Sequence, residues 1–248
     1  MDLGLTVLGC ATPYPTADIP CSGYLLTHDD TRVWMDAGTG TLGPLQRHTR
    51  LEDLDAIWIS HLHADHSADL LTTYYALLFA DVSRPPVPLY GPPGIAERLA
   101  GFLTNGPVRS PVEDAFAITE LRDGHEVAVG SMVLTTAAVE HGMPAFGVRV
   151  EAGGRSLTYS GDTAPCPRLT ALAERTDVLV CEAESTTPNA VHHTPEDAGE
   201  TAATAGVKRL VVTHVGRSLT PEEAAVRASA RYAGPIDHAV PGATFTAG

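Results

Sequence analysis

The stretch SHLHADH, at residues 60–66, is the part of the chain best suited to chemistry. It holds three of the 11 histidines in the sequence and one aspartate. His61 and His63 are two residues apart, so in an extended chain their side chains point to the same side. Asp65 and His66 come next, where a helix is expected to begin. Imidazole and carboxylate groups at this density are typical metal ligands, and the turn between the two pairs could supply two ions.

One segment cannot complete two metal sites, because each ion needs four or five ligands. Further candidates stand where other predicted strands end. His141 follows MVLTTAAVE, Asp162 follows LTYS, and His214 follows RLVVT. Asp36, after RVWM, is a fourth polar residue in such a position. Each could alone be an ordinary turn or capping residue, but their common placement favours one site at an edge of the sheets.

Short apolar or alternating stretches bounded by turn residues predict the strands that must position these side chains. The first half of the chain has strand signals at 3–9, 23–27, 31–36, 55–60 and 86–91, with helices over 67–81 and from about 94 to 103. The second half repeats the scheme, with strands near 115–120, 125–129, 132–139, 145–151, 155–160, 177–183 and 209–213, a final short strand, and helices near 167–175, 195–205 and 221–232. We expect one domain over residues 1–248, an α/β fold with two sheets face to face and helices outside.

Composition excludes several classes of protein. The chain has 248 residues, 44% of them hydrophobic, which suits one large domain. No apolar run is long enough for a membrane span, and the N-terminus lacks a basic leader, so we expect a cytoplasmic protein. Its four scattered cysteines are then expected to be reduced. The formal net charge of −14 argues against a broad nucleic-acid-binding surface.

The ordered set of candidate residues resembles the metallo-β-lactamase-fold hydrolases over almost the whole chain. The resemblance implies a four-layer αββα sandwich with a two-metal site along one edge. One metal would take His61, His63 and His141, and the other Asp65, His66 and His214. Asp162 would bridge the two ions, and Asp36 would orient the ligand loop by hydrogen bonding. These ligands favour two Zn²⁺ per chain, with Mn²⁺ or Fe²⁺ as alternatives. A lactamase of the common zinc class would have a cysteine at the second metal, so the resemblance disfavours antibiotic hydrolysis.

Further segments, including CEAES (181–185) and HHTPEDAGETAATAGVKRLVVTHV (192–215), look like the ribonuclease Z branch of that family. There a glutamate and a histidine assist the metals, and we match them here to Glu182 and His193. Asp65 would hold the attacking hydroxide, and His193, oriented by Glu182, would protonate the leaving oxygen. His192 has no matching role and is expected to be a solvated loop residue. The chain departs from the branch at Cys181, where a histidine is usual.

A second departure bears on the substrate. Ribonuclease Z proteins carry a long arm for tRNA between the third histidine and the bridging aspartate, whereas only GMPAFGVRVEAGGRSLTYSG separates His141 from Asp162. Without an arm, and with a net negative charge, tRNA binding is not expected. The compact layout resembles small bacterial relatives that hydrolyse cyclic nucleotides. We therefore predict hydrolysis of a small phosphodiester such as 3′,5′-cyclic AMP by attack of a metal-bridged hydroxide.

Other interpretations stay open. A thioesterase or lactonase would use the same metals, tRNA 3′ processing could proceed without the arm, and a metal-binding sensor would have no activity. The resemblance also implies a homodimer, paired through residues about 37–50 and 67–82. Tyr74, Tyr75 and Phe79 of one predicted helix could serve that contact or belong to the core.

Overall fold

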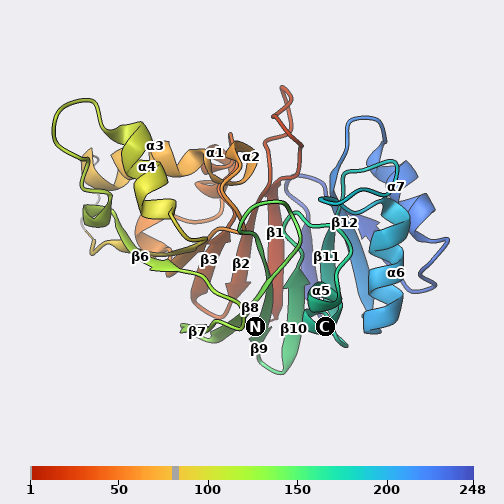
Figure 1. Cartoon of the computed structure of the whole chain (residues 1–248). Helices are drawn as coiled ribbons and strands as arrows, with labels where there is room; N and C mark the ends of the chain where they lie inside the picture. Colours follow the sequence, from red (N-terminus) through yellow and green to blue (C-terminus); the bar gives the residue numbers. More distant parts are fainter. Residues whose placement is uncertain (1, 80–83) are drawn as a thin grey trace.

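The computed structural model describes residues 2–79 and 84–248. Two seven-stranded sheets pack face to face, with helices on both outer sides (Figure 1). The first sheet has the order β14-β1-β2-β3-β4-β5-β6 and the second β13-β12-β11-β10-β9-β8-β7. This arrangement confirms the predicted αββα sandwich.

Each sheet is built mainly from one half of the chain. The first contains β1 (Leu3–Gly9), β2 (Gly23–His28), β3 (Thr31–Met35), β4 (Ala56–Trp58), β5 (Val87–Gly91), β6 (Phe116–Glu120) and, from the end of the chain, β14 (Thr244–Ala247). The second contains β7 (Glu126–Val129), β8 (Met132–Ala138), β9 (Phe146–Ala152), β10 (Arg155–Tyr159), β11 (Val178–Ala183), β12 (Arg209–Val215) and β13 (Ile236–His238).

The helices divide in the same way. The first half supplies α1 (Leu42–Leu45), α2 (Ala64–Ser67), α3 (Asp69–Phe79) and α4 (Ile95–Leu103), with two short 3₁₀ turns at Leu51–Asp53 and Val112–Asp114. The second half supplies α5 (Pro167–Leu172), α6 (Pro195–Ala205) and α7 (Pro221–Ala228). Both α6 and α7 begin with a threonine cap followed by proline, and both caps form the reciprocal hydrogen bonds of a capping box.

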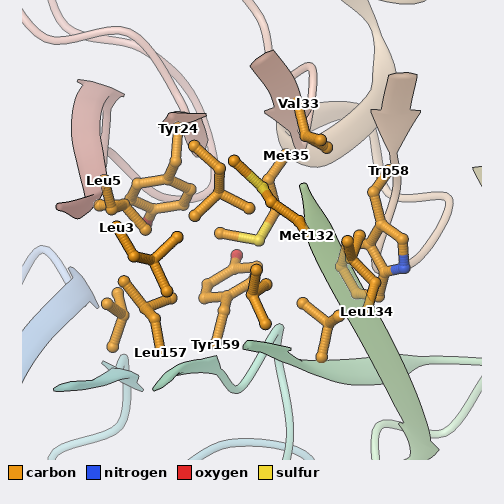
Figure 2. Close-up of a cluster of buried hydrophobic side chains, with 14 of the residues drawn as sticks. Leu3, Leu5, Tyr24, Val33, Met35, Trp58, Met132, Leu134, Leu157 and Tyr159 are labelled. Atoms are coloured by element: carbon orange, nitrogen blue, oxygen red, sulfur yellow. The ribbon is translucent and has the colours of Figure 1, made fainter. Parts of the chain in front are cut away.

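The core between the sheets holds side chains from both halves of the chain. Figure 2 shows Leu5, Tyr24 and Met35 of the first sheet facing Leu157 and Tyr159 of the second. Two further clusters fill the space between each sheet and its outer helices. These layers fix the ends of the central strands, and the candidate residues follow those ends.

Several local expectations were wrong in detail. The helix expected over 67–81 is α2 followed by α3, and residues 80 and 81 lie outside the described part of the chain. The strand expected at 55–60 ends at Trp58, because the Ser60 amide donates to the side chain of Asp36 instead of to a neighbouring strand. The short strand β13 was not predicted.

The aromatic residues of α3 are not equivalent. Tyr74 is buried in the cluster under the helix, so it belongs to the core and cannot serve a dimer contact. Tyr75 and Phe79 are exposed, with their rings stacked 5.8 Å apart between centroids. All four cysteines are free thiols. Within residues 2–79 and 84–248, none of the helices has the length and apolar character needed to cross a bilayer.

Candidate metal centre

Seven side chains that could bind metal ions come together at one edge of the sandwich. His61 and His63 stand in the irregular segment after β4, and Asp65 and His66 lie on α2. The other three follow or end strands of the second sheet, so both sheets contribute. The side chains form two groups in which the candidate ligand atoms lie within 4.8 Å of one another: His61, His63, His141 and Asp162, and Asp65, His66 and His214.

The first group brings three imidazoles to a common point. Nε2 of His61 lies 3.0 Å from Nδ1 of His63, and Nε2 of His141 lies 3.2 Å from the same atom. Nitrogens bound tetrahedrally to one zinc at about 2.0–2.1 Å would be roughly 3.3 Å apart. His63 is the exposed member, so the group opens to solvent on its side.

Asp162 lies between the two groups. Its Oδ2 is 3.7 Å from Nε2 of His61 and 3.2 Å from Nε2 of His214. Its Oδ1 is 3.3 Å from Nε2 of His66. Asp65 completes the second group, with Oδ2 3.8 Å from His66 and 3.9 Å from His214. One buried carboxylate therefore faces both candidate ion positions.

Hydrogen bonds on the outer side fix the orientation of the imidazoles. Nδ1 of His66 donates to Oδ2 of Asp36 at 2.7 Å, and Nδ1 of His141 donates to the Val191 carbonyl at 2.8 Å. Ser60 donates its only hydroxyl proton to Asp36, so Nδ1 of His61, 3.1 Å away, must donate to Ser60. With Nδ1 as the donor in these three rings, Nε2 faces the cluster and can offer a lone pair to a metal ion.

Asp36 holds this outer network together from the end of β3. It is fully buried and adopts a left-handed backbone conformation with φ of 55°. Its carboxylate accepts hydrogen bonds from the amide and hydroxyl of Ser60, from His66 and from the hydroxyl of Tyr159. His214 has an equivalent outer partner in Ser22, whose Oγ is 2.9 Å from its Nδ1. Sequence reasoning missed Ser22, Ser60 and Tyr159, because ordinary residue types carry no signal of such contacts.

The cluster is chemically suited to divalent cations. Among the described residues, Nε2 of His66 and Oδ1 of Asp162 are buried without a hydrogen-bond partner, a costly state that a bound cation would relieve. Burial, reinforced by neighbouring His66, holds the pKa of His61 well below its ordinary value, so that ring is neutral. The residues present therefore fit a pair of nitrogen- and oxygen-ligated metal ions.

The structure places His192, not His193, against Glu182. Nδ1 of His192 is 2.9 Å from Oε1 of Glu182, and its ring lies 4.9 Å from that of His141 and 6.3 Å from that of His214. Glu182 is fully buried and also accepts the amides of Thr163 and Glu184. Burial alone would lower the pKa of His192, but the contact with Glu182 outweighs it and raises that pKa.

His193 points the other way, so its expected pairing with Glu182 is wrong. It is fully buried, and its Nδ1 donates to the Thr163 carbonyl at 2.6 Å while Nε2 lies 3.2 Å from the Thr201 hydroxyl. Burial lowers the pKa of His193 to about 4. His192 and His193 precede α6 in extended backbone, where consecutive side chains face opposite sides. This is why His192, and not His193, faces Glu182. His192, expected to be solvated, is the ring beside the candidate metal ligands.

Comparisons with known proteins agree with this architecture. Residues 31–215 match the family model described as "Beta-lactamase superfamily domain". An uncharacterised protein of Mycobacterium leprae is 35% identical over 97% of this chain and 87% of its own length. A ribonuclease Z of Mycobacterium sp. (strain KMS) is 32% identical over 93% of this chain and 90% of its own. The metallo-β-lactamase fold protein YhfI of Bacillus subtilis superposes with a TM-score of 0.87 at 23% identity, covering 99% of this chain and 100% of that one. The chain belongs to the beta-lactamase superfamily and has ribonuclease Z among its relatives.

Proposed function

We propose that the chain is a two-metal phosphodiesterase that hydrolyses a small phosphodiester such as 3′,5′-cyclic AMP. Two Zn²⁺ would be held, one by His61, His63 and His141 and the other by Asp65, His66 and His214, with Asp162 between them. Bound divalent ions supply Lewis-acid chemistry, activating water and neutralising charge on the phosphoryl oxygens. Asp65 would orient the attacking water by accepting its proton at a carboxylate oxygen.

The contact between His192 and Glu182 carries the proposal. Phosphodiester hydrolysis releases an alkoxide that needs a proton, and a general acid there is typically worth about 10²–10⁴ in rate. His192 is held at Nδ1 by Glu182, and its Nε2 has no hydrogen-bond partner within the described residues. The contact with Glu182 raises the pKa of His192, which favours the protonated ring that a donor at Nε2 requires. We therefore transfer to His192 the role first expected of His193.

The size of the substrate is inferred from what connects His141 to Asp162. That segment is the hairpin of β9 and β10, closed at Gly153 and Gly154, both with positive φ. It offers no long basic extension for a folded RNA, and the chain carries a net charge of −14. The relative named ribonuclease Z supports phosphodiester chemistry, and the short hairpin supports a small substrate.

The test compares two histidine variants on two leaving groups. His192→Ala should lower kcat for cyclic AMP by about 10²–10⁴ with both metals retained. The loss should shrink for bis(p-nitrophenyl) phosphate, because p-nitrophenolate leaves without a proton. His193→Ala is the neighbouring control and should show no such dependence on the leaving group. Equal losses on both substrates for His192→Ala would exclude it as the general acid.

The competing activities have different requirements. A thioesterase or lactonase does not need an acid for a ribose oxygen, and tRNA 3′ processing needs a grip on folded RNA. Metal-loaded protein should therefore turn over cyclic AMP faster than an acyl thioester or a precursor tRNA. Turnover of the thioester alone would overturn the reaction class, and turnover of precursor tRNA alone would overturn the substrate class.

A homodimer remains part of the proposal. Tyr75 and Phe79 give α3 an exposed apolar surface within the segment 67–82 that is expected to pair, although residues 80–82 lie outside the described part of the chain. The mass of the metal-loaded protein in solution at micromolar concentration should correspond to two chains. A monomer at that concentration would reject the pairing.

A further inference from the structure

A pocket of about 250 Å³ shares a wall with the metal centre. It lies between the loop that follows β1 and the loop that follows β12. His214 lines it, and Nε2 of the same ring is 3.2 Å from Oδ2 of Asp162. A ligand in the pocket would therefore touch the side of a residue whose other end faces the candidate ions. The volume is just below the roughly 300–1,000 Å³ of complete small-molecule sites, so it suits one part of a ligand.

The lining is mostly apolar with a few polar groups at defined places. Val215, Leu219 and Ala239 are among the apolar side chains, and Thr16 supplies a hydroxyl. Arg217 is the one charged side chain that lines it. A flat group with apolar faces and a hydrogen-bonding rim fits such a lining better than a flexible polar chain does.

Arg217 has a specific position but no charged partner. Its guanidinium carbon lies 4.1 Å from the centroid of the Tyr14 ring. Across the described residues, that contact is the only interaction recorded for the guanidinium. An arginine held on one face by an aromatic ring keeps its donors available, and planar cations of this kind stack on heterocycles. The chain has a net charge of −14, yet this arginine has no acidic partner among the described residues. Its guanidinium is therefore free to contact a ligand beside the metal centre.

The loop that carries Arg217 is held in place. A Cβ added at Gly216 would overlap the carbonyl oxygen of Glu184, so the loop lies directly against the end of β11. The amide of Leu219 donates to the Gly216 carbonyl at 2.9 Å, which closes the turn around Arg217. The pocket wall is therefore formed before any ligand arrives, which reduces the entropy lost on binding.

We propose that this pocket binds the heterocyclic base of a nucleoside phosphodiester, with Arg217 against the base and Tyr14 positioning Arg217. The inference rests on the proposed phosphodiesterase activity and deepens it, because it adds a base-recognition site to a centre that otherwise recognises phosphate. A single base would fill the space while the phosphate reaches the metal centre past His214.

The experiment uses two diesters that release the same p-nitrophenolate and differ in carrying a base. These are thymidine 5′-(p-nitrophenyl phosphate) and methyl p-nitrophenyl phosphate. The wild-type protein should have the higher kcat/KM for the thymidine ester. Arg217→Gln, and separately Leu219→Trp to fill the pocket, should lower that preference by about tenfold to a hundredfold, the usual effect of losing contacts to one base. Arg98→Gln removes an exposed charge from α4, in the other half of the molecule (Figure 1), and should keep the preference.

The outcomes separate the pocket from the reaction. An unchanged preference in both pocket variants would overturn the proposal, and so would equal losses on both esters, which would place Arg217 on the phosphate. If metal-loaded wild-type protein hydrolyses neither diester, the phosphodiesterase proposal fails, and binding of thymidine 5′-monophosphate by calorimetry decides about the pocket. Binding that weakens at least tenfold in Leu219→Trp would support it, and equal or absent binding would overturn it.

Discussion

His193 should make the folded protein less stable as the pH falls. Its pKa is about 4 in the folded chain and about 6.5 in an unfolded one. Below pH 6.5 this histidine therefore binds a proton more readily in the unfolded chain than in the folded one. Its contribution to the free energy of unfolding is lost as the pH falls towards 4. One pKa unit corresponds to about 1.36 kcal/mol. Protonation of His193 should therefore lower the free energy of unfolding by about 2 kcal/mol between pH 8 and pH 5, and by about 3.4 kcal/mol in total below pH 4.

The perturbation is His193→Asn. The amide nitrogen of asparagine can take the place of Nδ1 and donate to the Thr163 carbonyl, yet the side chain does not titrate. The variant should be less stable than wild type at pH 8, because it loses packing and the contact with Thr201. Between pH 8 and pH 5 its stability should fall by about 2 kcal/mol less than that of wild type.

The assay is urea unfolding of chelator-treated protein at both pH values, so that metal release does not contribute. His48→Asn, at an exposed position on the first half of the chain, is the matched control. The free energy of unfolding of the variant is compared with that of wild type at each pH. The informative quantity is how much this difference changes between pH 8 and pH 5. A value near zero would refute the reasoning, since it would mean that the buried ring does not resist protonation.

Three further changes test the candidate metal centre and the packing of the loop beside it. Asp162→Asn should lose most of both metals by elemental analysis, because its carboxylate faces both ligand groups, and loss of one metal only would argue against a shared ligand. Asp36→Asn should weaken metal binding by about 10–100-fold in a competition with a chelating dye, because it disturbs the hydrogen bond that orients His66. A metal affinity equal to that of wild type would mean that Asp36 stabilises the fold without affecting metal binding. Gly38→Ala should cost about 1–3 kcal/mol in urea unfolding, because the added Cβ would overlap the Asp65 carbonyl oxygen. A stability equal to wild type would mean that the chain relaxes there freely.

Features that depend on the spacing of residues close together in the chain could be predicted from the sequence. The candidate ligand cluster at residues 60–66 could be found because its members are neighbours in the chain, and their positions near strand ends predicted that His141, Asp162 and His214 lie beside it. The alternation of apolar residues predicted two sheets, but β13 is too short to produce such a signal. Which of the two adjacent histidines faces the site depends on their contacts with Glu182, at the end of β11, and with Thr201, on α6, and residue spacing does not predict these contacts. That choice is visible only in three dimensions.

The candidate ligands of the metal centre come from both sheets, at positions from His61 to His214 along the chain. Ions bound there would act as a crosslink between the two sheets, closing long loops of chain without a covalent bond. The layers would then be pinned along one edge by coordination and held elsewhere by apolar packing. Removing the metals should loosen that edge first, so chelated protein is expected to exchange amide hydrogens faster around Asp36, Ser60 and Asp162 than in the core between the sheets.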